Sequence, residues 1–264
     1  MKKRAAVVGV GYLGRFHAQK YKTLSQQPQS QVELVAVCDL HAPQAELVAQ
    51  ELQVQAVTDP KKLIGQVDMV SIATITPVHF QLAKFFLENG VHVNVEKPIC
   101  LNTRESEQLL QIARDKKLVL SVGHSERFNP AFQNMKNHLQ DKVHNLSFLE
   151  LNRYAPFKRR GSDVSALHDL MIHDLDLMRA LVGTKEKIKL INAVGGKLVT
   201  DTLDWCSATF QIGQHLRCQI NCSRVAKEMT RTIRAIGTHN IYFANLQTGD
   251  FESALILGDQ QGKE

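Results

Sequence analysis

Short apolar runs alternate with helically spaced segments through the first half of the chain. The apolar runs at 5–8, 32–38, 67–73, 91–95 and 118–122 predict strands. Amphipathic spacing predicts helices at 12–22, 43–52, 60–64, 78–88 and 103–117, the last with Asn102 or Thr103 as its N-cap. Strands that alternate with helices are typical of an α/β domain with a doubly wound parallel sheet. We expect this domain to span residues 1–123.

The second half has a different pattern, in which extended runs follow one another. Helical spacing predicts helices at 128–139 and 162–181. Extended runs at 143–154, 188–198, 205–212, 216–222, 230–236 and 241–244 predict strands joined by short polar or glycine-bearing links. We therefore expect an α+β domain over residues 124–264, with an open, mostly antiparallel sheet and helices on one face.

A glycine-rich turn follows the first predicted strand. Gly9, Gly11 and Gly14 have the G-x-G-x-x-G spacing of a dinucleotide-binding loop. In such a loop the glycines permit a tight turn, close approach to a pyrophosphate and close helix–strand packing, and the helix N-terminus attracts phosphates. The alternative is a tight loop in some other α/β fold, since three glycines at this spacing also arise by chance.

Asp39 ends the second predicted strand, roughly 25 residues beyond the glycines, where a carboxylate can bind an adenosine ribose. The alternative is an N-cap for the helix near Pro43. The ribose role favours NAD over NADP, because a carboxylate repels a 2′-phosphate and the nearby His41 is a poor substitute for a phosphate-binding arginine.

Composition narrows the class of protein. The 264 residues suit two domains, and 44% hydrophobic with 22% charged residues is typical of a globular protein with a substantial core. No apolar run reaches about 18 residues, so we expect no membrane span, and the basic residues 1–4 precede a strand rather than a signal peptide. A net charge of +6 suits an anionic cofactor and substrate, and no nucleic-acid-binding module is recognisable. Five cysteines without a C-x-x-C pair indicate reduced thiols of a cytoplasmic protein and no metal site.

Two further groups of residues can carry chemistry. Glu96-Lys97-Pro98 follows a predicted parallel strand, at the sheet edge where ligands bind, and an ammonium there can hydrogen-bond a substrate hydroxyl. The alternative is a solvated lysine paired with Glu96.

Asp169, His173 and Asp176 stand at i, i+4 and i+7 of a predicted helix and would share one face. Histidine can accept a hydroxyl proton near neutral pH, and a carboxylate one turn away can orient it. The alternative is a solvated polar face, and His168 and Asp174 are expected to be surface or packing residues.

These motifs, together with Thr76-Pro77-Val78-His79 and Arg127-Phe128-Asn129-Pro130, resemble the glucose-fructose oxidoreductase/inositol dehydrogenase (Gfo/Idh/MocA) family. The resemblance implies an N-terminal Rossmann domain, a C-terminal α/β domain and oxidation of a sugar or cyclitol hydroxyl with a nicotinamide cofactor. It implies Lys97, His173 and Asp169 as catalytic residues. The implied cofactor contacts are Gly9, Gly11, Tyr12, Leu13, Gly14, Asp39, Thr74, Pro77, His79 and Glu96. The implied substrate contacts are Arg127, Asn129, Arg153, Arg159, Arg160 and Asp176.

The segment 153–164, joined to 168–176, is similar to bacterial UDP-N-acetylglucosamine 3-dehydrogenases, which act ahead of an aminotransferase in making amide-linked lipid A precursors. Arg153, Lys158, Arg159 and Arg160 could neutralise a diphosphate; a solvated basic loop is the alternative. The resemblance thus implies an NAD-dependent oxidation of UDP-N-acetylglucosamine at C3. A dehydrogenase of a free sugar or cyclitol and a non-catalytic NAD(P)-binding sensor remain as alternatives.

The chain departs from the family in two ways. Members usually run some tens of residues longer, so the end at 260–264 indicates either a natural shortening or a truncated product. Met171 stands where many members have glycine, and we expect it to narrow the pocket or pack on the cofactor. Members usually associate through the outer face of the C-terminal sheet, which implies a homodimer or homotetramer.

Overall fold

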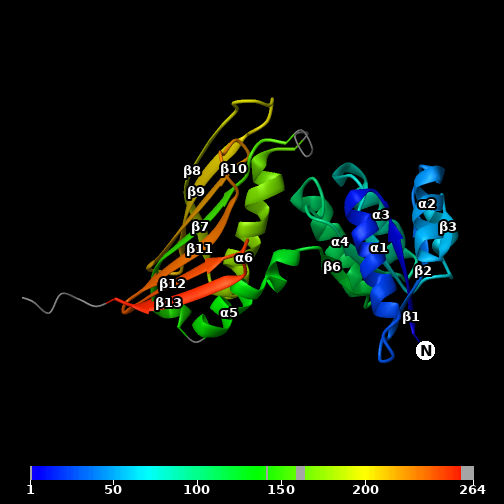
Figure 1. Cartoon of the computed structure of the whole chain (residues 1–264), viewed down its shortest axis with the longest axis horizontal. Coiled ribbons are helices and arrows are strands. Elements are labelled where there is room, and N and C mark those ends of the chain that lie inside the picture. Colours follow the sequence, from blue (N-terminus) through cyan, green and yellow to red (C-terminus); the bar gives the residue numbers. More distant parts are fainter. Residues whose placement is uncertain (1, 141, 159–163, 257–264) are drawn as a thin grey trace, which may run out of the picture. The chain divides into compact units, whose positions relative to one another are not determined.

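The computed structural model describes residues 2–140, 142–158 and 164–256 (Figure 1). The chain divides into two compact units, residues 1–123 and 124–264. No helix within the described ranges is long and apolar enough to cross a membrane.

The first unit is built on a six-stranded parallel sheet of order β3-β2-β1-β4-β5-β6. Its strands are β1 (Lys3–Val8), β2 (Val32–Cys38), β3 (Gln55–Val57), β4 (Met69–Ile72), β5 (His92–Val95) and β6 (Leu120–Val122). Its helices are α1 (Tyr12–Ser25), α2 (Ala42–Leu52), α3 (His79–Glu88) and α4 (Thr103–Asp115), with short 3₁₀ turns η1 (Pro60–Leu63) and η2 (Thr76–Val78). The predicted doubly wound sheet is confirmed.

The apolar run that ends β1 is buried on both faces of this sheet. Ala6 and Val8 pack in a core with α3 and α4, whereas Val7 packs in a second core with α1 and α2. A continuous apolar strand is what a parallel sheet covered on both faces requires. The strand order reverses beside β1, so the segments that follow β1 and β4 lie at the switch point where ligands of such sheets bind.

The second unit is a seven-stranded sheet of order β13-β12-β11-β7-β10-β9-β8, in which only the described β7–β10 pairing is parallel. Its strands are β7 (Leu146–Tyr154), β8 (Ile188–Gly196), β9 (Trp205–Ile212), β10 (Leu216–Ser223), β11 (Thr230–Gly237), β12 (Asn240–Asn245) and β13 (Asp250–Leu255). Its helical segments are η3 (Ser125–Phe128), α5 (Pro130–Leu139), η4 (Val143–Asn145), the π-helix η5 (Leu167–Met171) and α6 (Ile172–Val182). Helices α5 and α6 cover one face of the sheet (Figure 1), which confirms the predicted mostly antiparallel α+β arrangement.

Period-2 patterning along the strands separates the two faces of this sheet. In β10, Cys218 and Ile220 are buried in the core beneath the helices, while Gln219 and Asn221 lie on the other face. There Asn221 bonds Asn152 of β7 at 2.9 Å and accepts a bond from Ser207 of β9 at 2.7 Å. The outer face is therefore a ladder of hydrogen-bonded polar side chains.

The single helix predicted over 162–181 is corrected by the structure. Its described part begins with the π-helical turn η5 and continues as α6. A π-turn contains more residues than an α-turn, so Asp169 in η5 departs from the simple i, i+4 register expected with His173 in α6. Such turns are frequent at functional sites.

Candidate functional site

The three glycines after β1 each have a distinct environment. Gly9 has a φ of +82°, and a Cβ there would lie 2.6 Å from Thr74 Cγ2. A Cβ on Gly14 would lie 1.7 Å from the Gly9 carbonyl oxygen, so α1 packs against the loop only because residue 14 is glycine. Gly11 has an ordinary φ of −66°, and apart from the adjoining backbone no described atom lies within 4 Å of the Cβ position. The fold therefore requires glycine at 9 and 14, whereas the open space at Gly11 leaves room for a ligand.

Two observations fit a dinucleotide at this loop. Helix α1 begins at Tyr12 with Gly11 as its N-cap, so no side chain from the cap covers the first N–H groups, which suit an anion. At the end of the neighbouring strand β4, the buried hydroxyl of Thr74 has no hydrogen-bond partner among the described residues. An unsatisfied buried hydroxyl beside an open helix N-terminus is expected where a polar ligand completes the site.

Asp39 braces the glycine loop. Its carboxylate accepts the Val10 N–H at 2.9 Å and the His41 N–H at 3.0 Å. The N-cap of α2 is His41, so the N-cap alternative for Asp39 is not what the structure shows. Gln44, which the sequence analysis missed, donates to the Val10 carbonyl at 2.7 Å from the first turn of α2.

Glu96 is the first residue after β5. Its carboxylate bonds His17 Nε2 of α1 at 2.7 Å and accepts the Lys97 N–H at 3.3 Å. Burial by itself raises the pKa of Glu96, but the His17 bond and the charges of His17 and Lys97 outweigh it and lower that pKa. Sequence reasoning missed His17; its position one turn after Gly14 on the helix face beside Ala18 was the available signal.

His79, the first residue of α3, is 1% exposed and joins two loops of the first unit. Its Nδ1 lies 2.9 Å from the Pro98 carbonyl oxygen and its Nε2 lies 3.1 Å from the Thr74 carbonyl oxygen. The Lys97–Pro98 peptide bond is cis. Pro77 lies in η2, two residues before this histidine. The side chain of His79 therefore joins the backbone that follows β4 to the backbone that follows β5.

In the second unit, the predicted substrate residues Arg127 and Asp176 bind one another. The guanidinium donates two bonds to the carboxylate, at 2.7 and 2.5 Å, and His124 Nε2 lies 3.7 Å from the same carboxylate. The hydrogen bond to Asp176 raises the pKa of Arg127. Asp169 and His173 are half-buried on the same helical segment.

The structure assigns structural roles to two other predicted substrate residues. Arg153 is 2% exposed, and its guanidinium forms a bidentate pair with Asp174 at 2.9–3.1 Å and reaches Glu126 at 3.2 Å. Asn129 caps α5 by accepting the Ala131 N–H at 3.0 Å and donates to the Leu246 carbonyl at 2.7 Å. Its buried ion pair removes Arg153 from the expected substrate contacts, whereas the substrate contact of the partly buried Asn129 stays a prediction.

Arg159 and Arg160 lie outside the described residues, and Lys158 beside them is exposed. Met171 was expected to narrow the pocket or pack on the cofactor; instead it is 1% exposed and packs in the core of the second unit. The apolar interior of this unit takes up its side chain.

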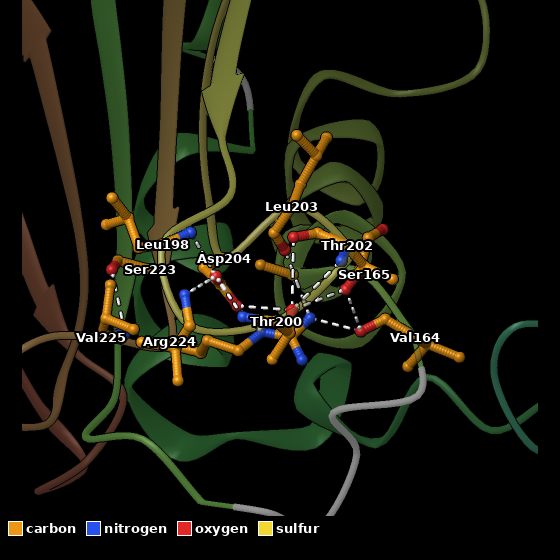
Figure 2. A network of polar contacts seen from close by, with 12 residues as sticks. Val164, Ser165, Leu198, Thr200, Thr202, Leu203, Asp204, Ser223, Arg224 and Val225 are labelled. Carbon is orange, nitrogen blue, oxygen red and sulfur yellow. Dashed lines mark hydrogen bonds and ion pairs between the residues drawn. The ribbon is translucent and has the colours of Figure 1, made fainter.

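A buried polar network that the sequence analysis missed holds the segment leading into η5 (Figure 2). Asp204 accepts backbone N–H bonds from Leu198, Val199 and Thr200 at 2.7–3.0 Å and lies 3.7 Å from Arg224 Nε. Arg224 in turn donates to the carbonyl oxygen of Val164.

The link between β8 and β9, which contains these residues, also anchors the backbone just before η5. The Leu203 carbonyl accepts the Ala166 N–H at 2.7 Å. The network therefore positions the backbone three residues before Asp169.

No cluster of three or more His, Cys, Asp or Glu residues that could hold a metal ion occurs in the described part of the chain. The side chains of Lys97, Asp169 and His173 are of types that can hydrogen-bond and exchange protons.

Comparison with known proteins identifies both halves of the chain. Residues 3–124 match the oxidoreductase family with an NAD-binding Rossmann fold, and residues 143–253 match the GFO/IDH/MocA C-terminal domain. The chain is 40% identical over 231 residues to a UDP-N-acetylglucosamine 3-dehydrogenase of Acidithiobacillus ferrooxidans, covering 88% of this chain and 70% of that protein. It is 30% identical over 190 residues to a scyllo-inositol 2-dehydrogenase (NAD(+)) of Bacillus subtilis, covering 69% of this chain and 54% of that protein.

Solved structures agree with the sequence comparison. A structure of the A. ferrooxidans UDP-N-acetylglucosamine 3-dehydrogenase superposes with a TM-score of 0.85 at 34% identity, covering 99% of this chain and 85% of that one. The expected family, the NAD cofactor and the oxidoreductase class are confirmed. The chain belongs to the Gfo/Idh/MocA family of NAD-binding oxidoreductases.

Proposed function

We propose that this protein oxidises the C3 hydroxyl of UDP-N-acetylglucosamine with NAD, giving a 3-keto sugar nucleotide and NADH. The observation that carries the proposal is the 40% identity to a UDP-N-acetylglucosamine 3-dehydrogenase over 88% of the chain. The family's acid–base residues support it, since Lys97, Asp169 and His173 are all present.

The first unit would hold the cofactor. The N–H groups at the start of α1 and the open space at Gly11 suit the pyrophosphate, and the carboxylate of Asp39 suits the ribose. Bound NAD supplies the acceptor for the hydride that leaves the sugar carbon. The Thr74 hydroxyl has free hydrogen-bonding capacity among the described residues for a cofactor group.

The remaining chemistry is proton transfer by the chain's own residues. In this proposal Lys97 donates a hydrogen bond to the substrate oxygen and stabilises the negative charge that develops as its proton leaves. His173 accepts that proton, and Asp169 orients the imidazole and stabilises its charged form. The C–H bond and the O–H bond break, a C=O bond forms, the hydride goes to the cofactor and the proton goes to His173.

A specific observation favours a second candidate, oxidation of a free cyclitol or sugar. It is the 30% identity to an inositol dehydrogenase over 69% of the chain. The diphosphate of a UDP-sugar distinguishes the two candidates. We propose that Arg159 and Arg160 bind it, so their replacement by glutamine should weaken turnover of UDP-sugars and leave turnover of a free sugar unchanged.

Absorbance at 340 nm tests the proposal directly. Purified protein with NAD should form NADH on addition of UDP-N-acetylglucosamine, and less or none with UDP-glucose, free N-acetylglucosamine, myo-inositol or scyllo-inositol. Turnover of an inositol without turnover of UDP-N-acetylglucosamine would overturn the substrate assignment.

Variants then test the catalytic roles. Lys97→Met and His173→Asn should each lower kcat by about 10²- to 10⁴-fold while calorimetry shows NAD binding unchanged. Lys62→Met, at an exposed lysine of η1, is the matched control and should behave as wild type. Unchanged kcat in His173→Asn would favour a protein that binds NAD without using this residue for catalysis.

We also propose that the protein is a cytoplasmic homodimer or homotetramer. The five cysteines are free and buried, as suits a reducing compartment. At the edge of the second sheet, β8 leaves Leu190, Ile191 and Val194 each at least 50% exposed, which is apolar surface that a second copy could cover. Light scattering after size exclusion tests the assembly, and a monomer at micromolar concentration would refute it.

A further inference from the structure

The residues on both sides of Lys97 are held by histidines from two different helices. On one side, His17 of α1 bonds the Glu96 carboxylate at 2.7 Å, and that carboxylate also accepts the N–H of Lys97 itself. On the other side, His79 of α3 lies 2.9 Å from the carbonyl oxygen of Pro98. The backbone of Lys97 is thus tied to both faces of the parallel sheet, because α1 and α3 contribute to opposite cores.

Burial makes both ties strong. The side chains of His17 and Glu96 are 28% and 14% exposed, and His79 is 1% exposed. A buried hydrogen bond to a charged group is worth more than an exposed one, because water competes less for its partners. Gly123 closes the same region, since a Cβ there would lie 2.8 Å from Glu96 Oε1.

His79 also joins this segment to the cofactor side of the unit. Its Nε2 lies 3.1 Å from the carbonyl oxygen of Thr74, and Thr74 forms the wall against Gly9. Both partners of the ring are carbonyl oxygens, and a neutral imidazole carries one N–H, so the ring donates to one of them and contacts the other. One side chain therefore sets the distance between the Pro98 backbone and the Thr74 backbone.

We propose that His17 and His79 are positioning residues for Lys97, which hold its backbone from both sides so that its ammonium is presented in one place. The inference rests on the proposed function, because it assigns a purpose to the two ties only if Lys97 contacts the substrate. In this proposal neither histidine exchanges a proton with the substrate.

Amide side chains allow the ties to be broken one at a time. Glutamine places an N–H₂ group near the Nε2 position of histidine, and asparagine places one near the Nδ1 position. His17→Gln keeps a donor for Glu96, whereas His17→Leu removes it. His79→Asn places a donor near the Pro98 carbonyl and none near that of Thr74, whereas His79→Gln does the reverse.

Steady-state kinetics with UDP-N-acetylglucosamine give the first readout. We expect His17→Leu and His79→Gln to lower kcat by about 10- to 100-fold, the scale of a misplaced catalytic group, with little change in KM. His17→Gln and His79→Asn should restore most of kcat. His239→Leu, at an exposed histidine of the second unit, is the control and should match wild type.

Amide hydrogen exchange over residues 94–101 gives a readout that needs neither cofactor nor turnover. Exchange in this segment should be faster in His17→Leu and His79→Gln than in their paired amide variants, with the rest of the first unit unchanged. The His17 pair carries the test if the buried His79 variants do not fold, since His17 is partly exposed.

The outcomes separate this inference from the proposed function. Unchanged exchange in His17→Leu, or faster exchange with kcat intact, overturns the positioning role. Equal loss of kcat in His17→Leu and His17→Gln also overturns it. If the wild type oxidises no sugar, the proposed function has failed, and the exchange data alone then decide whether the histidines fix the Lys97 segment.

Discussion

Replacement of Asp204 by asparagine should destabilise the second unit, although the two side chains have the same shape. The carboxylate is fully buried and accepts three backbone N–H bonds, together with the Thr200 hydroxyl at 2.8 Å (Figure 2). It also lies 3.7 Å from Arg224 Nε. The neutral amide keeps the volume and removes the charge that all these donors share.

The magnitude follows from the contacts. A hydrogen bond to a charged group is worth about 1.5–3 kcal/mol, against about 0.5–1.5 kcal/mol for a neutral pair. Loss of about 1 kcal/mol from each of three amide bonds gives roughly 3 kcal/mol. Removing one partner of a buried ion pair costs about 3–5 kcal/mol. Because these effects overlap, we expect the free energy of unfolding to fall by about 3–5 kcal/mol at pH 7.

The effect should depend on pH in a defined direction. Burial by itself raises the pKa of Asp204, but the N–H groups of Thr200, Val199 and Leu198 and the Thr200 hydroxyl outweigh it and hold that pKa well below its usual range. A lowered pKa in the folded state stabilises the protein above the unfolded pKa of about 4 and loses this contribution as the pH falls. The difference between wild type and Asp204→Asn should therefore shrink by about 1.4 kcal/mol for each pH unit below about 4.

The chain provides its own probe for this measurement. Trp205 is the only tryptophan and adjoins Asp204, so its fluorescence reports unfolding of the second unit during a urea titration. Asp201→Asn is the matched control, because Asp201 is exposed three residues away, and it should change stability by less than about 0.5 kcal/mol. A loss below about 1 kcal/mol at pH 7, or a loss of the same size at pH 3, would refute the reasoning.

Gly14→Ala should lower Tm markedly in a thermal melt, because its Cβ would lie 1.7 Å from a backbone oxygen. Gly11→Ala should keep Tm and weaken NAD binding measured by calorimetry, because the Cβ position at residue 11 is open. Equal effects of the two variants on Tm would contradict this prediction. Arg153→Met should lower the free energy of unfolding, measured by urea titration, by about 3–5 kcal/mol, because Asp174 stays buried without its bidentate partner. The double variant with Asp174→Leu should recover part of this loss, because it also removes the unpaired charge. The five buried cysteines should resist a thiol reagent at pH 8 until guanidinium is added. Burial raises the pKa values of their thiols, that of Cys38 to about 12, so few of them are present as the reactive thiolate. Fast reaction of the native protein would count against their burial.

Strands with a strong hydrophobic signal were predictable and strands with a weak one were not. The run that ends β1 is buried on both faces, so its sequence is uniformly apolar and indicates a central parallel strand. β3 has three residues, two of them exposed, and β13 is an edge strand with mostly exposed residues. Neither sequence alternates apolar and polar residues as a strand with one buried face does. Each of these strands is defined by its pairing with a neighbouring strand.

Among the candidate site residues, a local motif was predictable and the partner of a charged side chain was not. Glycine spacing indicates a dinucleotide loop because the constraint acts over six consecutive residues. Arg153 looked like a phosphate ligand because it begins a basic run, yet its strand β7 turns it inward onto Asp174, 21 residues away in the chain. The partner of a long charged side chain is decided by which elements pack together, and that information is not local.

By itself, the sequence determined the alternation of strands and helices, the glycine loop and the family. These features depend on periodicity, caps and short motifs, each of which acts within one element. Only the tertiary structure decided that His17 and His79 hold the two sides of Lys97 and that Asp204 anchors the start of the helix bearing Asp169 and His173. Such contacts join residues that are distant in the chain, and they form only where the packing of apolar faces brings two elements together and excludes water from the polar groups between them.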